Sequence, residues 1–495
     1  MRIWILNPFD QLPNETDVPL RYWSLCKAFA SQGHEVTWWS SDFSHLTKSK
    51  RAPCPDTDGF AVRLIETPPY SQNISFARLK NHKAFADGFY RDALAALQSG
   101  KLEAPDRIVV SLPPLGIAEQ AFKIRDFIQQ SSPIHHPATT AACEVVVDIM
   151  DAWPETFYQA LPKPLRKLLG PLLLAPLHRS ARRAYQGADK ITAVGQSYLD
   201  LAATYLGYPP SATNPLAAGE AQSSQATPAK PMLLCYHGTD LERFQRFKTK
   251  HQEEGRAAAS RSAVTTQSSS PNKPLKAVYL GAMGQGYDLM TILKVAARWK
   301  AEGQFPIQIH FAGTGSQIAQ LKAYAAQEGL LSEAGDQSTE DNHPPSVISH
   351  QSSLTKSAPS AISHQSSVIN DSSRIVFHGL LNKDAVNELL LSSDLALVPN
   401  RPDSLVACPY KAGEYAAAGL PMLSCLSGEL NQLLSEWNAG SKYTEGDAAS
   451  LQAAFENYVS DPARLNRQSL NARNMAEALF DRNQTYAALA NFIIP

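Results

Sequence analysis

The sequence predicts an α/β protein built from two doubly wound, Rossmann-like parallel-sheet domains. Three observations support this fold class. Short apolar runs alternate with amphipathic stretches in both halves of the chain, which is the pattern of βαβ units. The chain has 495 residues, too many for one hydrophobic core. Low-complexity segments separate the halves, which gives domains over 1–205 and 275–470 and a junction over 206–274.

The first domain begins with an apolar run over 3–6 and an amphipathic helix that stops at Gly33. A βαβ start of this kind places binding sites at the carboxyl ends of the strands, so the loop over 7–19 is a candidate cleft loop. The loop lacks a G-x-G-x-x-G pattern, which argues against a nicotinamide-binding site. Further strands are predicted at 35–40, 62–65, 108–111, 145–148 and 191–194, with helices over 76–97 and 116–130.

Residues 161–183 differ from their surroundings, because leucines alternate with lysine, arginine and histidine and no acidic residue occurs. A basic amphipathic segment is typical of contact with a membrane surface or an acidic partner. The alternative is a basic surface helix that lies on its own domain with its charged ends in water. Prolines are expected to break the segment into pieces, at Pro162, Pro164, Pro171 and Pro176.

The second domain repeats the alternation of strands and helices. Its first two strands each end in a glycine-rich turn, with Gly284 and Gly286 in one turn and Gly313 and Gly315 in the other. Ordinary punctuation of a sheet is the alternative interpretation of each turn. Strands are predicted at 232–237 in the junction and at 277–280, 307–312, 375–379 and 395–398, with helices over 289–301, 385–392, 450–459 and 465–492.

Residues 332–373 are rich in serine and contain a near-duplicated stretch that ends in Ser-His-Gln-Ser-Ser. A slipped repeat is more typical of a tolerated, disordered insertion than of a site, so His350 and His364 are poor ligand candidates. The final helical segment, 471–495, is expected to pack back toward the first domain.

Residues 409–421 follow the last predicted strand of the second domain. Their alanine-rich centre predicts a short helix over 411–418, which the following glycine and proline end. Lys411 and Glu414 lie three positions apart and therefore share a helix face. A solvated ion pair worth a few tenths of a kcal/mol is one interpretation of this spacing, and a binding site is the other.

The composition limits the function classes. With 45 basic and 46 acidic side chains, the chain has no global field that favours nucleic acid, and any anion site must be local. The six cysteines lie far apart, so neither a disulfide framework nor a metal site is indicated. The N-terminal residues do not resemble a signal peptide, and no apolar stretch reaches the ~20 residues of a spanning helix. We therefore expect a cytoplasmic protein, at most peripherally bound to the inner membrane face.

Four stretches, in order along the chain, resemble motifs of the family 4 retaining glycosyltransferases. Residues 33–36 resemble the family's GHEV turn, and residues 148–155 resemble the D-x-x-D-x-W-P-E stretch of its bacterial polysaccharide branch. Residues 237–244 resemble the NGVDLERF segment at the domain junction. Residues 411–421 resemble the donor motif K-x-x-E-Y-x-A-x-G-x-P. The resemblance covers most of the chain apart from the insertions and implies the GT-B fold, in which two doubly wound domains face a cleft.

The resemblance also implies a nucleotide-sugar donor, no metal, no other cofactor and no protein nucleophile, with a donor phosphate oxygen assisting the acceptor hydroxyl. A departing diphosphate needs fixed positive charge and backbone N–H donors, which Lys411 and the glycine turns can supply. A carboxylate such as Glu414 suits the ribose hydroxyls. The donor-side candidates are Gly284, Gly286, Gly313, Gly315, Tyr410, Lys411 and Glu414.

On the acceptor side, Asp151 is a candidate for orienting or deprotonating a sugar hydroxyl, and Lys411 is the second catalytic candidate. For Asp151 the alternative is a cap or a surface turn. The other acceptor-side candidates are Asn14, Glu15, Pro113 and Glu155.

The chain departs from the family pattern at three points. The usual Gly-Gly near the first strand is replaced by a loop that contains Asn14 and Glu15. The family's paired glutamates would need Glu at position 406, where this chain has Val406, and the first glycine turn lacks the phosphate-binding lysine, offering Gln285 and Tyr287. We expect a glycosyltransferase whose acceptor is a glycan, lipid-linked if residues 161–183 contact a membrane. The alternatives are a sugar-nucleotide epimerase or hydrolase of the same fold and a non-catalytic nucleotide-binding subunit.

Overall fold

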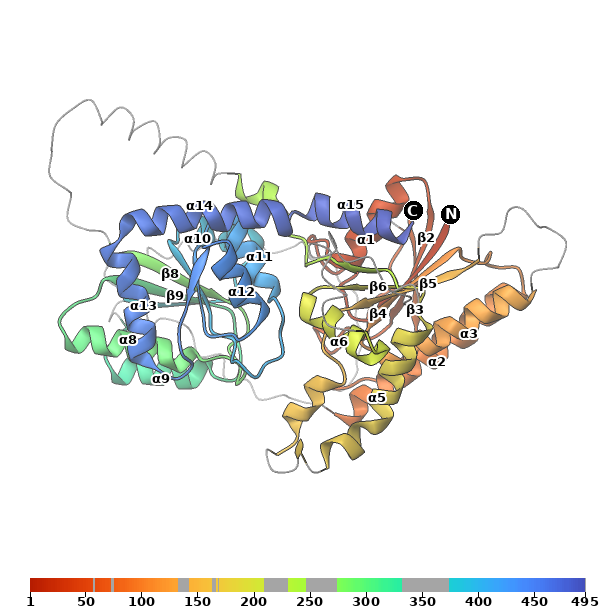
Figure 1. Cartoon of the computed structure of the whole chain (residues 1–495), viewed down its shortest axis with the longest axis horizontal. Coiled ribbons are helices and arrows are strands. Elements are labelled where there is room, and N and C mark those ends of the chain that lie inside the picture. Colours follow the sequence, from red (N-terminus) through yellow and green to blue (C-terminus); the bar gives the residue numbers. More distant parts are fainter. Residues whose placement is uncertain are drawn as a thin grey trace, which may run out of the picture.

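The computed structural model contains two α/β domains that lie side by side (Figure 1), the first drawn in red to yellow and the second in green to blue. The predicted insertion over 332–373 and most of the junction lie outside the described residues. No helix in the described ranges is long and apolar enough to cross a membrane. The structure describes residues 1–56, 58–72, 75–131, 142–162, 166–167, 169–208, 230–245, 274–331 and 374–494.

The first domain contains a seven-stranded parallel sheet in the order β3-β2-β1-β4-β5-β6-β7. The strand order reverses between β1 and β4, which is where doubly wound sheets bind ligands. β7 falls in the range that we assigned to the junction and pairs with β6. The elements are β1 (Arg2–Leu6), α1 (Arg21–Ser31), β2 (Glu35–Ser41), β3 (Ala61–Ile65), α2 (Phe76–Gln98), β4 (Arg107–Leu112), α3 (Leu115–Ser131), β5 (Glu144–Ile149), η1 (Glu155–Ala160), α5 (Gly170–Gly187), β6 (Lys190–Ala193), α6 (Gln196–Leu206) and β7 (Met232–Leu234).

The second domain contains a six-stranded parallel sheet in the order β10-β9-β8-β11-β12-β13. Its order reverses between β8 and β11, so the turns after these strands lie at its switch point. The elements are η3 (Leu241–Phe244), β8 (Leu275–Leu280), α8 (Leu289–Ala301), β9 (Ile307–Ala312), α9 (Ile318–Gln327), β10 (Ile375–Gly379), α10 (Lys383–Leu391), β11 (Leu395–Val398), α11 (Tyr410–Ala417), β12 (Met422–Ser424), α12 (Glu429–Glu436), β13 (Gly440–Lys442), α13 (Ala448–Ser460), α14 (Pro462–Leu479) and α15 (Arg482–Ile493).

The first sheet is buried on both faces, and β1 shows how the sequence achieves this. Trp4 and Leu6 pack into one core, whereas Ile3 and Ile5 pack into the core on the opposite face. Successive side chains of a strand alternate between faces, so four consecutive apolar residues produce a central strand covered on both sides. Helices α2, α3, α5 and α6 contribute to the first of these cores, and α1 and α15 contribute to the second.

Two predictions about helices are wrong. We predicted one helix over 465–492, but the structure has α14 and α15 with a break between them. We expected Pro171 and Pro176 to break the segment 161–183, but α5 is continuous through both; Pro162 precedes this helix, and Pro164 lies outside the described residues. Pro171 lies in the first turn of α5, where a backbone N–H would have no acceptor within the helix, so proline is tolerated there. Pro176 lies within the helix and is exposed.

The break between α14 and α15 coincides with the return of the chain to the first domain, where Figure 1 shows α15 beside α1. The N–H of Thr239 donates to the carbonyl of Phe480 at 2.6 Å, and the N–H of Arg482 donates to the carbonyl of Thr239 at 3.0 Å. Thr239 lies on the segment where the chain leaves the first domain, which we call the outgoing chain. Because the backbone of residues 480–482 pairs with Thr239, it does not continue the helix. Asp481 then caps α15 by accepting a bond from the N–H of Asn483 at 2.9 Å. The chain passes between the domains twice, at Thr239 and at residues 480–482. We call these two paired segments the hinge.

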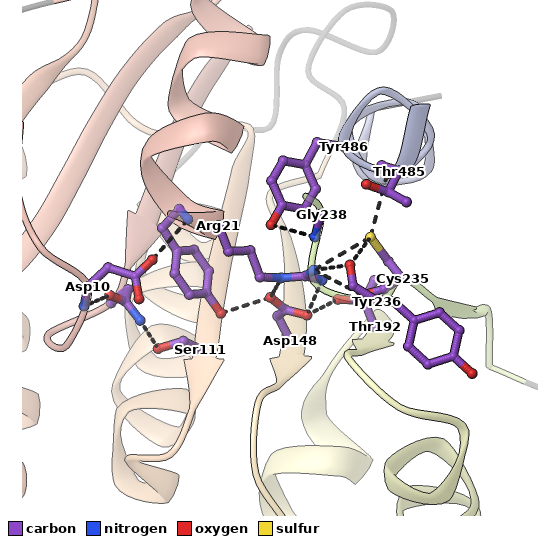
Figure 2. A network of polar contacts seen from close by, with 12 residues as sticks. Asp10, Arg21, Ser111, Asp148, Thr192, Cys235, Tyr236, Gly238, Thr485 and Tyr486 are labelled. Carbon is purple, nitrogen blue, oxygen red and sulfur yellow. Dashed lines mark hydrogen bonds and ion pairs between the residues drawn. The ribbon is translucent and has the colours of Figure 1, made fainter. Parts of the chain in front are cut away.

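Figure 2 shows a buried polar network beside this hinge. Arg21 on α1 donates to both carboxylate oxygens of Asp148 on β5, from Nε at 2.8 Å and from Nη2 at 2.9 Å. Arg21 also donates to the carbonyl of Cys235 at 2.9 Å and lies 5.6 Å from the ring of Tyr486 on α15. Burial favours the neutral acid, but the charge and hydrogen bonds of Arg21 lower the pKa of Asp148 below its usual value. One side chain thus joins α1, β5, the outgoing chain and α15.

The variant Arg21→Met is expected to lower the free energy of unfolding by about 3–5 kcal/mol, because it leaves the Asp148 carboxylate buried without its partner. The matched control is Lys27→Met on the same helix, which removes an ion pair with Asp58 at 3.6 Å. Since that pair is partly exposed, the control is expected to cost about 1 kcal/mol at most. Urea unfolding of the full chain, followed by circular dichroism, measures both. Equal unfolding midpoints for the two variants would contradict the prediction.

Candidate active site

Two glycine-rich turns pack backbone against backbone at the carboxyl ends of β8 and β9. Gly281 and Gly313 have φ angles of +132° and +130°. A Cβ on Gly313 would lie 2.0 Å from the carbonyl oxygen of Gly281, and a Cβ on Gly315 would lie 2.5 Å from backbone of the first turn. Only glycine therefore fits these two positions. Gly284 and Gly286 have open space where a Cβ would be, so the outer part of the first turn is accessible.

Lys411 on α11 reaches the first of these turns. Its ammonium lies 4.7 Å from the centre of the Tyr279 ring and 5.3 Å from that of Tyr287. A Cβ on Gly281 would lie 2.1 Å from Lys411 Nζ, so the absence of a side chain at 281 makes room for the charge. Burial lowers the pKa of Lys411 to about 8, and the nearby Glu414 carboxylate opposes this shift. A half-buried cation at a glycine turn is suited to binding an anion.

Glu414 lies one turn further along α11 and pairs with Arg243 of η3. Arg243 Nη1 donates to Glu414 Oε1 at 3.3 Å, and its Nη2 donates to Asn387 of α10 at 2.6 Å. Burial raises the pKa of Glu414, and the charge of Arg243 opposes the rise. Lys411 and Glu414 therefore have separate partners. Sequence reasoning did not assign Arg243 a role, although it lies within 237–244, the stretch that resembles the family's junction segment.

The position of α11 is set from two sides. The hydroxyl of Tyr415 accepts a bond from the N–H of Leu280 at 2.8 Å, which fixes α11 to the end of β8. A Cβ on Gly413 would lie 2.5 Å from Thr239 Oγ1 of the hinge, so the helix and the hinge touch. The ring of Tyr410, a predicted donor-side residue, lies 5.4 Å from that of His237 on the outgoing chain. The orientation of Lys411 is thus coupled to the hinge.

The segment before α11, which carries Val406, packs against the first domain. The hydroxyl of Tyr198 on α6 donates to the carbonyl of Leu405 at 3.2 Å and accepts a bond from the N–H of Ala407 at 3.4 Å. Ala407 is 5% exposed and belongs to a core of the first domain. Leu405 has a φ of +54°, which is uncommon for a residue with a side chain. The backbone around position 406 is therefore shaped by the domain interface.

Glu429, in the first turn of α12, makes a second contact between the domains. Its carboxylate accepts bonds from the N–H of Gln196 at 2.7 Å, the N–H of Ser197 at 3.1 Å and the hydroxyl of Tyr236 at 2.7 Å. Gln196 and Ser197 begin α6, so a carboxylate of the second domain caps a helix of the first. Glu429 is 8% exposed, and a Cβ on Gly195 would lie 3.1 Å from its Oε2. We call this contact the Glu429 latch.

Asp151 follows β5 and is held by its own turn. Its Oδ1 accepts bonds from the N–H of Ala152 at 2.8 Å and the hydroxyl of Thr156 at 3.3 Å, and its Oδ2 accepts one from Trp153 Nε1 at 3.1 Å. Burial raises the pKa of Asp151, whereas these bonds oppose the rise. Burial and then the charge of Asp151 raise the pKa of Tyr198, so the carboxylate lies close to the domain interface.

Two of the other acceptor-side candidates hold the loop after β1. Glu15 Oε2 accepts a bond from the N–H of Leu12 at 2.9 Å, and its Oε1 lies 3.3 Å from Arg51 Nε. Asn14 is exposed and donates to the carbonyl of Pro53 at 3.2 Å. Both side chains thus have local partners that shape this loop.

The last two acceptor-side candidates point elsewhere. Glu155 accepts a bond from the hydroxyl of Tyr205 on α6 at 2.8 Å, and Pro113 is buried in the turn after β4. The structure therefore gathers the donor-side candidates around α11 and the glycine turns, but gives the acceptor-side candidates different partners. Within the described ranges, no group of three or more His, Cys, Asp or Glu side chains could hold a metal ion.

Comparisons with known proteins bear on the fold. No protein-family model matches the chain, and no curated protein matches it in sequence. Sucrose-phosphate synthase from Thermosynechococcus elongatus matches with a TM-score of 0.60 and 12% identity, over 99% of this chain and 97% of its own. Anabaena HepE in complex with UDP matches with a TM-score of 0.55 and 11% identity, over 99% of both chains. WaaG, a glycosyltransferase involved in lipopolysaccharide biosynthesis, matches with a TM-score of 0.54 and 12% identity, over 99% of both chains.

The chain has the GT-B fold. The predicted fold class, two doubly wound parallel-sheet domains, is confirmed. In the GT-B arrangement of this chain, α11 and the turns after β8 and β9 belong to the second domain, while Asp151 belongs to the first. The hinge, the Glu429 latch and the segment before α11 determine how these two groups of residues face each other.

Replacing Glu429 with Gln tests the latch. The neutral amide keeps the size of the side chain but loses the charge that caps α6, at a cost of about 1–2 kcal/mol. Opening of the first turn of α6 should then rise roughly five- to thirtyfold. Hydrogen exchange of peptides from residues 196–206 measures this rise. Glu436→Gln, at the exposed end of α12, is the control, and equal exchange in the two variants would show that the latch contributes nothing.

Proposed function

We propose that this chain is a glycosyltransferase that moves a sugar from a nucleoside diphosphate donor to a glycan acceptor. The observation that carries the proposal is the ammonium of the half-buried Lys411 side chain at the glycine turn after β8. Proteins of similar fold support this donor class, since HepE has been solved with UDP and with UDP-glucose, and WaaG is a glycosyltransferase. The donor motif over 411–421 supports it from the sequence.

Lys411 supplies the charge that the first glycine turn lacks. The family 4 resemblance would place a phosphate-binding lysine after this turn, where the chain has Gln285 and Tyr287. Lys411 reaches the same turn from α11, with its ammonium over the Tyr287 ring. The cation of the diphosphate site therefore comes from a different element, and the turn itself contributes accessible backbone at Gly284 and Gly286.

Negative charge grows on the diphosphate as the glycosidic bond breaks. Lys411 and backbone N–H groups of the glycine turns stabilise that charge in surroundings that are already buried, so little reorganisation is needed. Glu414 binds the ribose hydroxyls, with Arg243 holding the carboxylate in place at 3.3 Å. Gly313 and Gly315 allow the backbone of the second turn to approach the nucleoside closely.

We further propose that transfer is metal-independent and retaining, as the family 4 resemblance implies. In that mechanism a donor phosphate oxygen takes the proton of the acceptor hydroxyl. Asp151 orients the hydroxyl from the first domain, and its three hydrogen bonds within the turn fix the direction of the carboxylate.

The acceptor is proposed to be lipid-linked and reached at an anionic membrane surface. The start of α5 exposes Leu169, Leu172 and Leu173, with fractional exposures of 38%, 73% and 56%. Lys167 and Arg179 on the same segment are also exposed. Exposed leucines beside lysine and arginine match the interfacial region of a membrane that carries anionic lipids.

Two other functions are alternatives, a non-catalytic nucleotide-binding subunit and a sugar-nucleotide epimerase or hydrolase. Val406 in place of a glutamate and the absence of the usual phosphate lysine favour a non-catalytic nucleotide-binding subunit. A sugar-nucleotide epimerase or hydrolase of the same fold would use the same donor site without needing the acceptor groups of the first domain.

UDP affinity is expected to fall as the pH rises above about 8, because Lys411 then loses the charge that attracts the diphosphate. The ammonium is protonated below this pH and neutral above it, so the affinity should drop by up to tenfold per pH unit until the pKa of the bound state is reached. Calorimetry from pH 6.5 to 9.5 measures the profile. In Lys411→Arg the guanidinium stays charged, and the drop should disappear. The same pH profile in both proteins would exclude Lys411 as the cation.

Incubation of the full chain with a panel of nucleotide sugars and a bacterial membrane extract tests the function. Transfer predicts that release of nucleoside diphosphate requires the extract. Turnover without extract would instead support the epimerase or hydrolase, and binding without turnover would support the non-catalytic subunit.

Glu414→Ala is expected to weaken nucleotide binding and abolish transfer, and unchanged affinity in calorimetry would contradict the role of Glu414.

A further inference from the structure

A closed loop of hydrogen bonds holds the short helix η1, which follows the turn of Asp151. We call this loop the His178 network. Glu155 and Tyr158 lie three positions apart on η1, and side chains at this spacing point the same way on a 3₁₀ helix. The network runs from Tyr158 through His178 on α5 and Tyr205 on α6 back to Glu155. It therefore starts and ends on one turn of η1.

The bonds of the His178 network all run in one direction. The hydroxyl of Tyr205 donates to Glu155 Oε1 at 2.8 Å, so it accepts the bond from His178 Nδ1, at 2.5 Å. His178 Nε2 then accepts from the hydroxyl of Tyr158 at 3.0 Å. Burial and the charge of Glu155 raise the pKa of Tyr205, so its hydroxyl keeps the proton that it donates. One neutral imidazole, with one donor and one acceptor nitrogen, completes the loop.

The network determines the orientation of η1. Within the described ranges, Glu155 Oε2 is buried and accepts no hydrogen bond, so the bond from Tyr205 orients the carboxylate. The aromatic ring of Tyr158 lies against the start of α5, since a Cβ on Gly170 would lie 2.6 Å from it. Helices α5 and α6 also pack against each other. η1 is thus fixed to a pair of helices of the first domain.

η1 in turn contacts the Asp151 turn and the second domain. The hydroxyl of Thr156 donates to Asp151 Oδ1 at 3.3 Å, and its N–H donates to the carbonyl of Ala152 at 2.8 Å. Further along η1, the side-chain amide of Gln159 donates to the carbonyl of Asp403, in the segment before α11. One short helix therefore joins the proposed catalytic carboxylate to the second domain.

α6 provides a common reference for these contacts. Its first turn is capped by the Glu429 latch, and its Tyr198 bonds the segment before α11. Tyr205, near the end of the same helix, belongs to the His178 network. The second domain and η1 are thus both positioned against α6, and the imidazole of His178 completes the connection to η1.

We propose that His178 is a positioning residue that sets where Asp151 lies at the domain interface. The role of Asp151 rests on the proposed function, whereas the network itself rests on the geometry. His178 acts through η1, because both of its ring nitrogens are used within the network. Without the imidazole, Tyr158 and Tyr205 lose their common partner, and η1 rotates together with the Asp151 turn. A misplacement of about 1 Å near the reacting atoms costs on the order of a hundredfold in rate.

Hydrogen exchange on the full chain tests the network. Tyr158→Phe and His178→Phe should each raise exchange in peptides that cover residues 151–160 about fivefold or more, since each removes one link of the closed loop. The double variant should exchange no faster than His178→Phe, because one missing link already opens the loop. His178→Gln keeps a donor and an acceptor and should restore much of the protection. The control is His34→Phe, which removes a histidine whose Nδ1 lies 3.2 Å from the N-terminal amine.

Transfer kinetics distinguish positioning from a merely structural role. With the nucleotide sugar that the native chain uses and the same bacterial membrane extract, kcat should fall about tenfold or more in Tyr158→Phe and His178→Phe. KM for the donor should stay within about twofold, because the donor site lies in the second domain. His178→Gln should recover most of kcat, and His34→Phe should keep the native value. The stoichiometry of UDP binding in calorimetry corrects each kcat for the folded fraction.

Native-like exchange of residues 151–160 in both Phe variants would overturn the proposal. Raised exchange with an unchanged kcat would overturn it as well, since η1 would then be stabilised by His178 without placing Asp151. A native chain that neither binds UDP nor turns over a nucleotide sugar would count against the proposed function, and the exchange experiment would still decide the network.

Discussion

The contact between Arg21 and Asp148 is the interaction on which the placement of the two domains depends. Taking both charges out of water costs several kcal/mol each, so such a pair persists only where its hydrogen bonds are complete. Asp148 meets this condition, because it also accepts bonds from Tyr22 at 2.8 Å and Thr192 at 2.7 Å. Arg21 then contacts the chain where it leaves the first domain and where it returns. The hinge is therefore anchored to the sheet of the first domain.

Most of the strands could be predicted from the sequence, because parallel strands buried on both faces leave continuous apolar runs such as residues 3–6. β12 and β13 have three residues each, too few to show a period. The donor motif predicted Lys411 and Glu414, but not that Glu414 would meet Arg243, 171 positions away. The Glu429 latch joins residues 233 positions apart. Spacing along one helix says nothing about such partners, since they are brought together only by the packing of two domains.

The hinge and the interface contacts act on the same helix. α11 touches the hinge through Gly413, and the segment before it touches the first domain through Leu405 and Ala407. A rotation of the domains must therefore change the surroundings of α11 from both ends. Lys411 lies on this helix, over Gly281, so a change in the domain arrangement is expected to change the position of its ammonium. A donor that binds Lys411 will favour the domain arrangement in which the ammonium fits the turn.

The contacts on both sides of Val406 give a physical reason for a valine at this position in place of the family's glutamate. Residues on both sides of Val406 bond Tyr198, whose pKa the charge of Asp151 helps to raise. A glutamate at 406 would therefore add a second negative charge close to Asp151. The donor proposed for this chain carries a negatively charged diphosphate. Two neighbouring carboxylates would repel it, because Coulomb energies grow as water is excluded from a closing site. With valine at 406 this second charge is absent, and the pKa of Asp151, which burial raises, is lowered by the hydrogen bonds of its own turn and by the charge of Arg78.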